Sequence, residues 1–159
     1  MTIQEQLMAD LRSAFAAVDR KPDSDLFTER EDHLWSEGLH EGTGPWWEVP
    51  AEALAHEPHA LDELTVDGFR FFLPAYLAWT INNARSAFST ADTVIYQLDV
   101  TGCEGPVRAD RLARYRSLSP AQSAVVSRFL AWAAMSGSGL DASAASRAAA
   151  AYWSSAKNC

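Results

Sequence analysis

Apolar side chains recur at every third or fourth position along most of this chain, and this spacing is typical of α-helices. The N-terminal segment shows it most clearly, through its apolar residues Ile3, Leu7, Leu11, Phe15 and Val18. Thr2 and Glu5 form a capping box ahead of these residues, a pattern that satisfies the free N–H groups at a helix start. We therefore expect a first helix over residues 2–19.

The same reasoning predicts several further helices. We expect them over residues 28–39, 50–55, 65–84, 91–98, 119–135 and 141–155. A capping box at Thr28 and Glu31 opens the first of these, and one at Ser119 and Gln122 opens the fifth. Pro74 lies inside the longest segment, so we expect a kink or two abutting helices there.

Strand patterns are almost absent from the chain. Residues 91–98 also fit a strand, but their helical spacing is favoured, and residues 99–117 are interpreted as a long, partly basic connection. We therefore expect an all-α fold in a single compact domain, residues 1–159, of about six helices, one of them kinked at Pro74. Residues 136–139 have the composition of a linker, so residues 136–159 also fit a C-terminal helical extension.

The N-terminal residues have neither the basic nor the apolar region of a signal peptide. The chain also contains no run of about 18 apolar residues, the length needed to span a membrane. We expect a cytoplasmic protein without membrane association. Cys103 and Cys159 lie outside any Cys-x-x-Cys pair, which favours two free thiols in a reducing compartment. A disulfide bond between these two cysteines is the alternative.

The net charge of −8 is distributed unevenly along the chain. Residues 23–67 carry thirteen acidic side chains and one basic side chain, Arg30, whereas residues 68–159 carry nine basic and five acidic ones. Nucleic-acid recognition needs concentrated positive charge, so we expect no nucleic-acid partner. The basic cluster Arg108, Arg111, Arg114 and Arg116 is expected to pair with the acidic half of the protein itself.

Residues 64–77 read Leu-Thr-Val-Asp-Gly-Phe-Arg-Phe-Phe-Leu-Pro-Ala-Tyr-Leu. They resemble the hallmark of a family of small bacterial proteins known only as a domain of unknown function, Leu-Thr-Pro-Glu-Ala-Phe-Arg-Tyr-Phe-Leu-Pro-Ala-Tyr. Three further pieces match in order, at residues 47–50, 92–96 and 118–122. This chain departs at Val66 and Gly68, and it adds the helix after Asp141. The resemblance implies a bacterial source and a shared fold, but no activity and no site residues.

His33, Glu37, His40 and Glu41 form the sharpest metal-like cluster. Positions 33, 37 and 40 share a helix face, and Glu37-x-x-His40 has the spacing found in carboxylate-bridged di-metal bundles. Such a site normally needs two of these motifs, and this chain has one. A solvated polar face is therefore the favoured interpretation, and no metal or cofactor is expected.

Six tryptophans are distributed along the chain. Trp79, Trp132 and Trp153 lie in or beside apolar stripes, so we expect them to be buried. Trp46 and Trp47 follow a Gly-Pro loop inside the acidic segment. We expect one of them to anchor this loop in the core, and an exposed partner among carboxylates would suit a protein-binding surface.

Three hypotheses for function remain, and the oligomeric state stays open. The first is a non-enzymatic bacterial interaction protein, an immunity or antitoxin-type inhibitor of a basic toxin or effector. Its predicted binding surface comprises Glu31, Asp32, Glu37, Glu41, Trp46, Trp47 and Glu48. The second is a metal-dependent or hydrolytic enzyme built on His33, Glu37 and His40, and the third is a structural or regulatory subunit. The lack of a recognisable catalytic motif favours the first.

Overall fold

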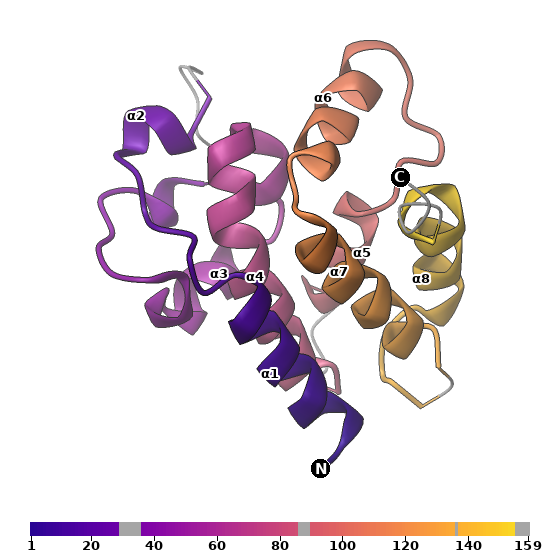
Figure 1. The fold of residues 1–159 in the computed structure, drawn as a ribbon. Coiled ribbons are helices and arrows are strands. Elements are labelled where there is room, and N and C mark those ends of the chain that lie inside the picture. The colour runs from indigo at the N-terminus through magenta and orange to yellow at the C-terminus, as the bar shows by residue number, and fades with distance from the viewer. Residues whose placement is uncertain (29–35, 86–89, 136, 155–159) are drawn as a thin grey trace.

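The computed structural model describes residues 1–28, 36–85, 90–135 and 137–154, and this part of the chain is mostly helical (Figure 1). It contains eight α-helices and no strand beyond an isolated bridge between Phe27 and Leu64. The predicted all-α single domain is confirmed. None of the described helices combines the length and the apolar character needed to cross a bilayer.

The first half of the chain contains α1 (Ile3–Ala14), α2 (Asp23–Leu26), α3 (Ala51–His56) and α4 (Val66–Asn83), with 3-10 turns η1 (Glu37–Leu39), η2 (Trp46–Glu48) and η3 (Ala60–Glu63). The second half contains α5 (Thr90–Gln97), α6 (Gly105–Arg116), α7 (Pro120–Ala133) and α8 (Ala142–Ala148), which continues into a π-helical turn, η4 (Ala149–Trp153). Six predicted helices are therefore present, and α2 and α6 are additional.

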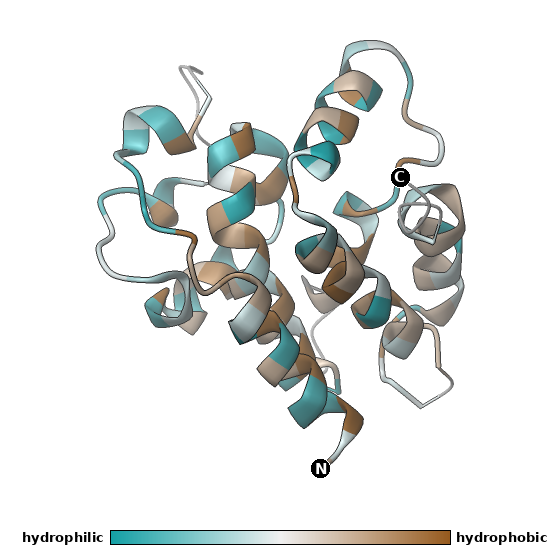
Figure 2. Cartoon of the chain, in the orientation of Figure 1, coloured by the Kyte–Doolittle hydropathy of each residue, from teal (hydrophilic) through white to brown (hydrophobic). Residues whose placement is uncertain are grey.

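Helix α4 lies at the centre of the fold and contacts α1, α2, α3, α5 and α6. Most of its residues are buried on all sides, as expected for a helix without a solvent-facing stripe. It continues through the buried Pro74 as one helix, so the alternative of two abutting helices is not formed. Figure 2 shows the contrast with α1, along which hydrophilic and hydrophobic residues alternate.

The helix starts agree with the sequence signals. In α1, Thr2 Oγ1 accepts from the Glu5 N–H at 3.1 Å and Glu5 Oε2 accepts from the Thr2 N–H at 2.6 Å. Ser119 and Gln122 form the same reciprocal pair at the start of α7. Asp141 caps α8 by accepting from the Ala144 N–H at 3.0 Å. These caps depend on residues three positions apart, which explains why the sequence shows them.

Only the two ends of the helix predicted over residues 28–39 lie within the described residues. The Thr28 N–H and hydroxyl both donate to the Glu63 carbonyl, at 3.2 and 3.0 Å, so Thr28 extends the bridge between Phe27 and Leu64. The other end contains only η1, preceded by the buried Ser36. Residues 37–39 therefore form a 3-10 turn instead of the predicted α-helix, and Glu31, the other member of the predicted capping box, lies outside the described residues.

Residues 105–116, predicted as a connection, form α6. The face that packs against α4 and η3 carries arginines and a tyrosine, so it has no apolar periodicity to detect. Arg114 is buried and donates from Nε to the Leu64 carbonyl at 2.8 Å, and burial lowers its pKa. Arg111 forms a bidentate pair with Asp62 at 2.9 and 3.1 Å. The predicted pairing with the acidic half is confirmed for Arg111.

Asp99, between α5 and α6, joins the second half of the fold through two charge-assisted contacts. Its carboxylate accepts from the Thr101 N–H and from Arg147 Nε, both at 2.9 Å, and its exposed fraction is 6%. Burial alone would raise the pKa of Asp99, but these hydrogen bonds outweigh burial and lower it. The contacts therefore stabilise the fold only while Asp99 is ionised.

We expect Asp99→Asn to lower the free energy of unfolding at pH 7 by about 1–3 kcal/mol, because Arg147 loses an ionised acceptor. Because the folded-state pKa is lowered, this stabilisation is present above the ordinary value of 3.8 and is lost as the pH falls through the folded-state pKa. Urea unfolding of both proteins at a series of pH values measures the difference. The exposed Asp110→Asn is the control, and a difference that persists unchanged in acid would contradict the prediction.

Candidate functional site

The predicted partner-binding residues separate into exposed, buried and undescribed ones. Glu31 and Asp32 lie outside the described residues. Glu37, Glu41 and Glu48 are exposed. Trp46 is 2% exposed and Trp47 is 39% exposed, so the structure places these neighbouring indoles in different environments.

Trp46 anchors the loop that follows η1. Its indole N–H donates to the Phe15 carbonyl at 3.1 Å, which ties the loop to the end of α1. Its ring meets Trp47 edge to face, with ring centroids 5.5 Å apart. The prediction that one of the pair anchors the loop is confirmed, and Trp46 is corrected from a partner-binding residue to a core residue.

Several acidic residues of the segment are neutralised within the protein. Asp23 is 3.3 Å from Arg20, Asp62 is paired with Arg111, and Asp67 is 3.0 Å from Lys21. Other carboxylates from η1, the following loop, η2 and α3 are exposed and form no ion pair within the described residues. We name this set the acidic face: Glu37, Glu41, Glu48 and Glu52. Its elements lie on the left side of the molecule in Figure 1.

The proposed metal cluster is only partly described, because His33 lies outside the described residues. His40 stacks on Phe27 with ring centroids 3.8 Å apart. Its Nδ1 is 3.7 Å from an Asp23 carboxylate oxygen, and its Nε2 is 3.4 Å from the Ser36 hydroxyl. His40 is thus in contact with a carboxylate that the sequence pattern did not single out. No set of three or more potential metal ligands is assembled within the described ranges.

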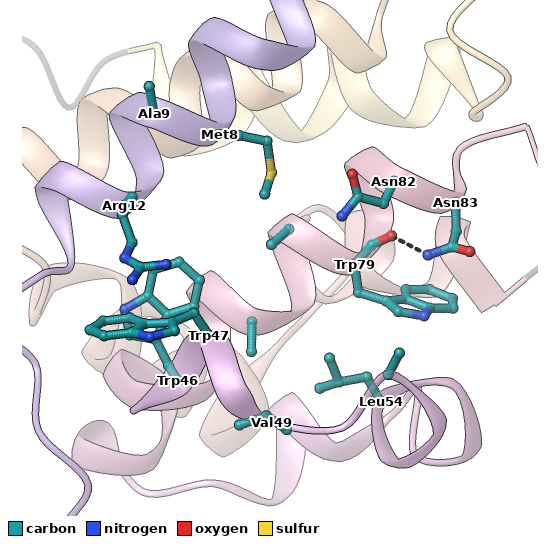
Figure 3. A pocket seen from close by; sticks show the side chains of 13 residues that line it. Met8, Ala9, Arg12, Trp46, Trp47, Val49, Leu54, Trp79, Asn82 and Asn83 are labelled. Carbon is teal, nitrogen blue, oxygen red and sulfur yellow. Dashed lines mark hydrogen bonds between the residues drawn. The ribbon is translucent and has the colours of Figure 1, made fainter. Parts of the chain in front are cut away.

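A pocket of about 670 Å³ opens between α1, α3, α4 and η2, and Figure 3 shows its side chains. We name it the tryptophan pocket, and it is lined by Met8, Ala9, Arg12, Trp46, Trp47, Val49, Ala51, Leu54, Ala75, Ala78, Trp79, Asn82 and Asn83. Trp79, which the sequence predicts as buried, is only partly buried because it faces this pocket. The volume lies in the range of about 300–1,000 Å³ typical of small-molecule sites.

Among the described residues, Arg12 is the one charged residue that lines the tryptophan pocket. Its guanidinium carbon lies 3.6 Å from the centroid of the Trp47 ring, a cation–π contact. At the opposite side, Asn83 donates from Nδ2 to the Trp79 carbonyl at 2.8 Å (Figure 3). The pocket therefore combines aromatic and aliphatic walls with a cation at one rim and amides at the other.

Comparison with known proteins adds a family. A model for a family of unknown function, DUF6714, matches residues 3–157. The chain belongs to this family. The expectation of a domain family without an established function is confirmed, and the matched region of the DUF6714 domain includes α8 and every element that lines the tryptophan pocket. No curated protein and no solved structure matches the chain.

A second, smaller groove of about 320 Å³ lies between α1 and α7. It exposes Ile3 and Met135, and it is flanked by an ion pair of 3.3 Å between Asp10 and Arg128. Its arginine is thus already neutralised, in contrast to Arg12 of the tryptophan pocket. The two sites allow a comparison between Arg128, which has an ion-pair partner, and Arg12, which has none within the described part of the chain.

Proposed function

We propose that this DUF6714 protein is a non-enzymatic bacterial binding protein that captures a basic protein partner, as an inhibitor of the immunity or antitoxin type. The observation that supports the proposal is the acidic face, whose carboxylates are exposed and form no ion pair with any described residue, while neighbouring acids are paired. A surface of one charge sign attracts a partner of the opposite sign and raises the association rate.

Trp47 supplies a second component of such a surface. It is 39% exposed and directly precedes Glu48, so an aromatic ring adjoins the acidic face. Exposed aromatic side chains contribute strongly to protein interfaces because they bury a large area at little entropic cost. Under this proposal, the carboxylates accelerate capture and Trp47 slows release.

Charge reversal tests the proposal. A variant with Glu37, Glu41, Glu48 and Glu52 all changed to Lys is used as bait beside the wild type in extracts of the source cell. We expect the wild type to retain a basic protein. Its binding to this protein should weaken in about 0.5 M salt, because salt screens the attraction between opposite charges. Reversal should reduce the association rate of the purified pair by 10-fold or more, because attraction becomes repulsion.

The matched control reverses two exposed acids of the other half, Glu104→Lys and Asp110→Lys. It should retain the partner at close to the wild-type rate. An acidic partner, or equal binding by the wild type and the reversed acidic face, would disprove the proposal. Surface plasmon resonance at two salt concentrations provides the rates.

A further inference from the structure

The walls of the tryptophan pocket are suited to an aromatic ligand. Trp46 and Trp47 lie at one side and Trp79 at the other, Val49 and Leu54 lie at the base, and the thioether of Met8 is directed inward from α1 (Figure 3). Aromatic and thioether side chains make favourable contacts with ring faces and edges. The space between the indoles thus favours a planar apolar group.

The Arg12 guanidinium has hydrogen-bond donors that no described residue uses. The Arg12 guanidinium carbon lies 3.6 Å from the Trp47 ring centroid, and the N–H donors of a guanidinium lie in the plane of the group. These N–H groups donate no hydrogen bond and form no ion pair within the described residues. A stacked guanidinium with free edges is pre-oriented for a bidentate contact with a carboxylate.

The charges around the pocket restrict the number of negative charges on the ligand. None of the described residues that line the pocket is acidic, so these walls do not repel an anion. It offers one cation in a chain of net charge −8, which disfavours a ligand with several negative charges such as a phosphate ester. A single carboxylate on an apolar ring matches both features.

We infer that the tryptophan pocket binds a small aromatic carboxylic acid, with its ring between Trp47 and Trp79 and its carboxylate on Arg12. Asn82 is exposed at the far rim, with its amide directed toward the pocket, and supplies a donor and an acceptor for a polar ring substituent (Figure 3). The pocket shares Trp47 with the proposed protein-binding surface, but its lining includes none of the acidic-face carboxylates, and its cation has the opposite charge sign. The inference therefore goes beyond the proposed capture of a basic protein.

Isothermal titration calorimetry with 1-naphthylacetate and its neutral amide, 1-naphthylacetamide, tests the inference on the full chain. The two probes share the ring and differ in charge. We expect the wild type to bind the acid about 10-fold more tightly than the amide, since this factor corresponds to about 1.4 kcal/mol, close to the lower end of the range for a hydrogen bond to a charged group. Arg12→Gln should remove the preference for the acid and leave binding of the amide nearly unchanged.

Arg128→Gln is the matched control, because it removes an arginine beside the groove between α1 and α7. It should retain the wild-type preference for the acid, and circular dichroism verifies that both variants fold. Failure of the acid to bind, equal affinity for acid and amide, or loss of the preference only in Arg128→Gln would overturn the inference. The variant with the reversed acidic face should still bind the acid, so failure of either proposal is recognised separately.

Discussion

Trp153→Ala is expected to lower the free energy of unfolding by about 3–5 kcal/mol, the range measured when large aromatic side chains are removed from protein cores. Residues near a terminus often tolerate substitution. Trp153 differs from a typical terminal residue because it is fully buried. Its position in η4 directs the indole into the contact between α8 and the rest of the fold.

Two contacts of Trp153 explain the size of the effect. Its Nε1–H donates to the Leu98 carbonyl at 3.0 Å, so truncation leaves this buried carbonyl without its donor. Its ring lies 4.7 Å from the Tyr115 ring, which is buried and belongs to α6. Removing the indole therefore creates a cavity where three helical segments meet, and the surrounding structure can fill it only in part.

Urea unfolding monitored by circular dichroism measures the change, with Trp47→Ala as the control. Trp47 is the same residue type but is 39% exposed, so we expect its truncation to cost less than about 1.5 kcal/mol. Trp153→Phe should lie between wild type and Trp153→Ala, because it keeps a ring and loses the hydrogen bond. Equal stability of Trp153→Ala and Trp47→Ala would show that η4 is not part of the cooperative core.

The features that the sequence predicts correctly depend on neighbours a few positions apart. The capping boxes at Thr2 and Ser119 and the apolar period of α1 and α7 are local signals, and the structure contains all of them. Helix α6 lacks such a signal because its inner face consists of polar groups with distant partners, such as Arg114 with the Leu64 carbonyl. A hydrophobic period cannot detect a helix that is held by charged hydrogen bonds.

The candidate sites also depend on contacts between residues that are distant in the sequence, which local patterns do not detect. Counting charges locates the acidic segment, but it cannot show that Arg20 and Lys21, which lie just before the segment, neutralise Asp23 and Asp67. The tryptophan pocket is harder still, because its walls come from segments near Met8, Trp47 and Trp79. None of these residues has a distinctive spacing relative to the others, and the packing of α1 and η2 on α4 brings them together.

Gly68→Ala is expected to be as harmful as a large truncation, although alanine is the better helix former. Gly68 lies in the first turn of α4, where intrinsic propensity alone predicts a gain of about 1 kcal/mol from alanine. A methyl group there would lie 2.0 Å from the carbonyl oxygen of Leu26 and 2.9 Å from its carbonyl carbon. Both are backbone atoms of α2, so no side-chain rotation relieves the clash.

The Leu26 carbonyl is also held in place. It accepts from the Thr65 N–H at 3.0 Å and from the Thr65 hydroxyl at 3.1 Å, next to the bridge between Phe27 and Leu64. Moving α2 away from an alanine at position 68 would break these hydrogen bonds and expose part of the core. We therefore expect a loss of about 3 kcal/mol or more in the free energy of unfolding, the range found for disrupted backbone packing.

Higher helix propensity would stabilise Gly68→Ala, whereas the clash with the Leu26 carbonyl would destabilise it. Urea unfolding of this variant therefore shows which effect dominates. Gly38→Ala is the control, because the nearest atom to its added methyl group is the end of the flexible Glu57 side chain at 3.2 Å. We expect the control to change stability by less than about 0.5 kcal/mol. Stability of Gly68→Ala at or above the wild-type value would mean that α2 is not docked on α4 in solution. Asp23 of α2, which accepts a hydrogen bond from the Glu41 N–H, would then not fix the position of Glu41 in the acidic face.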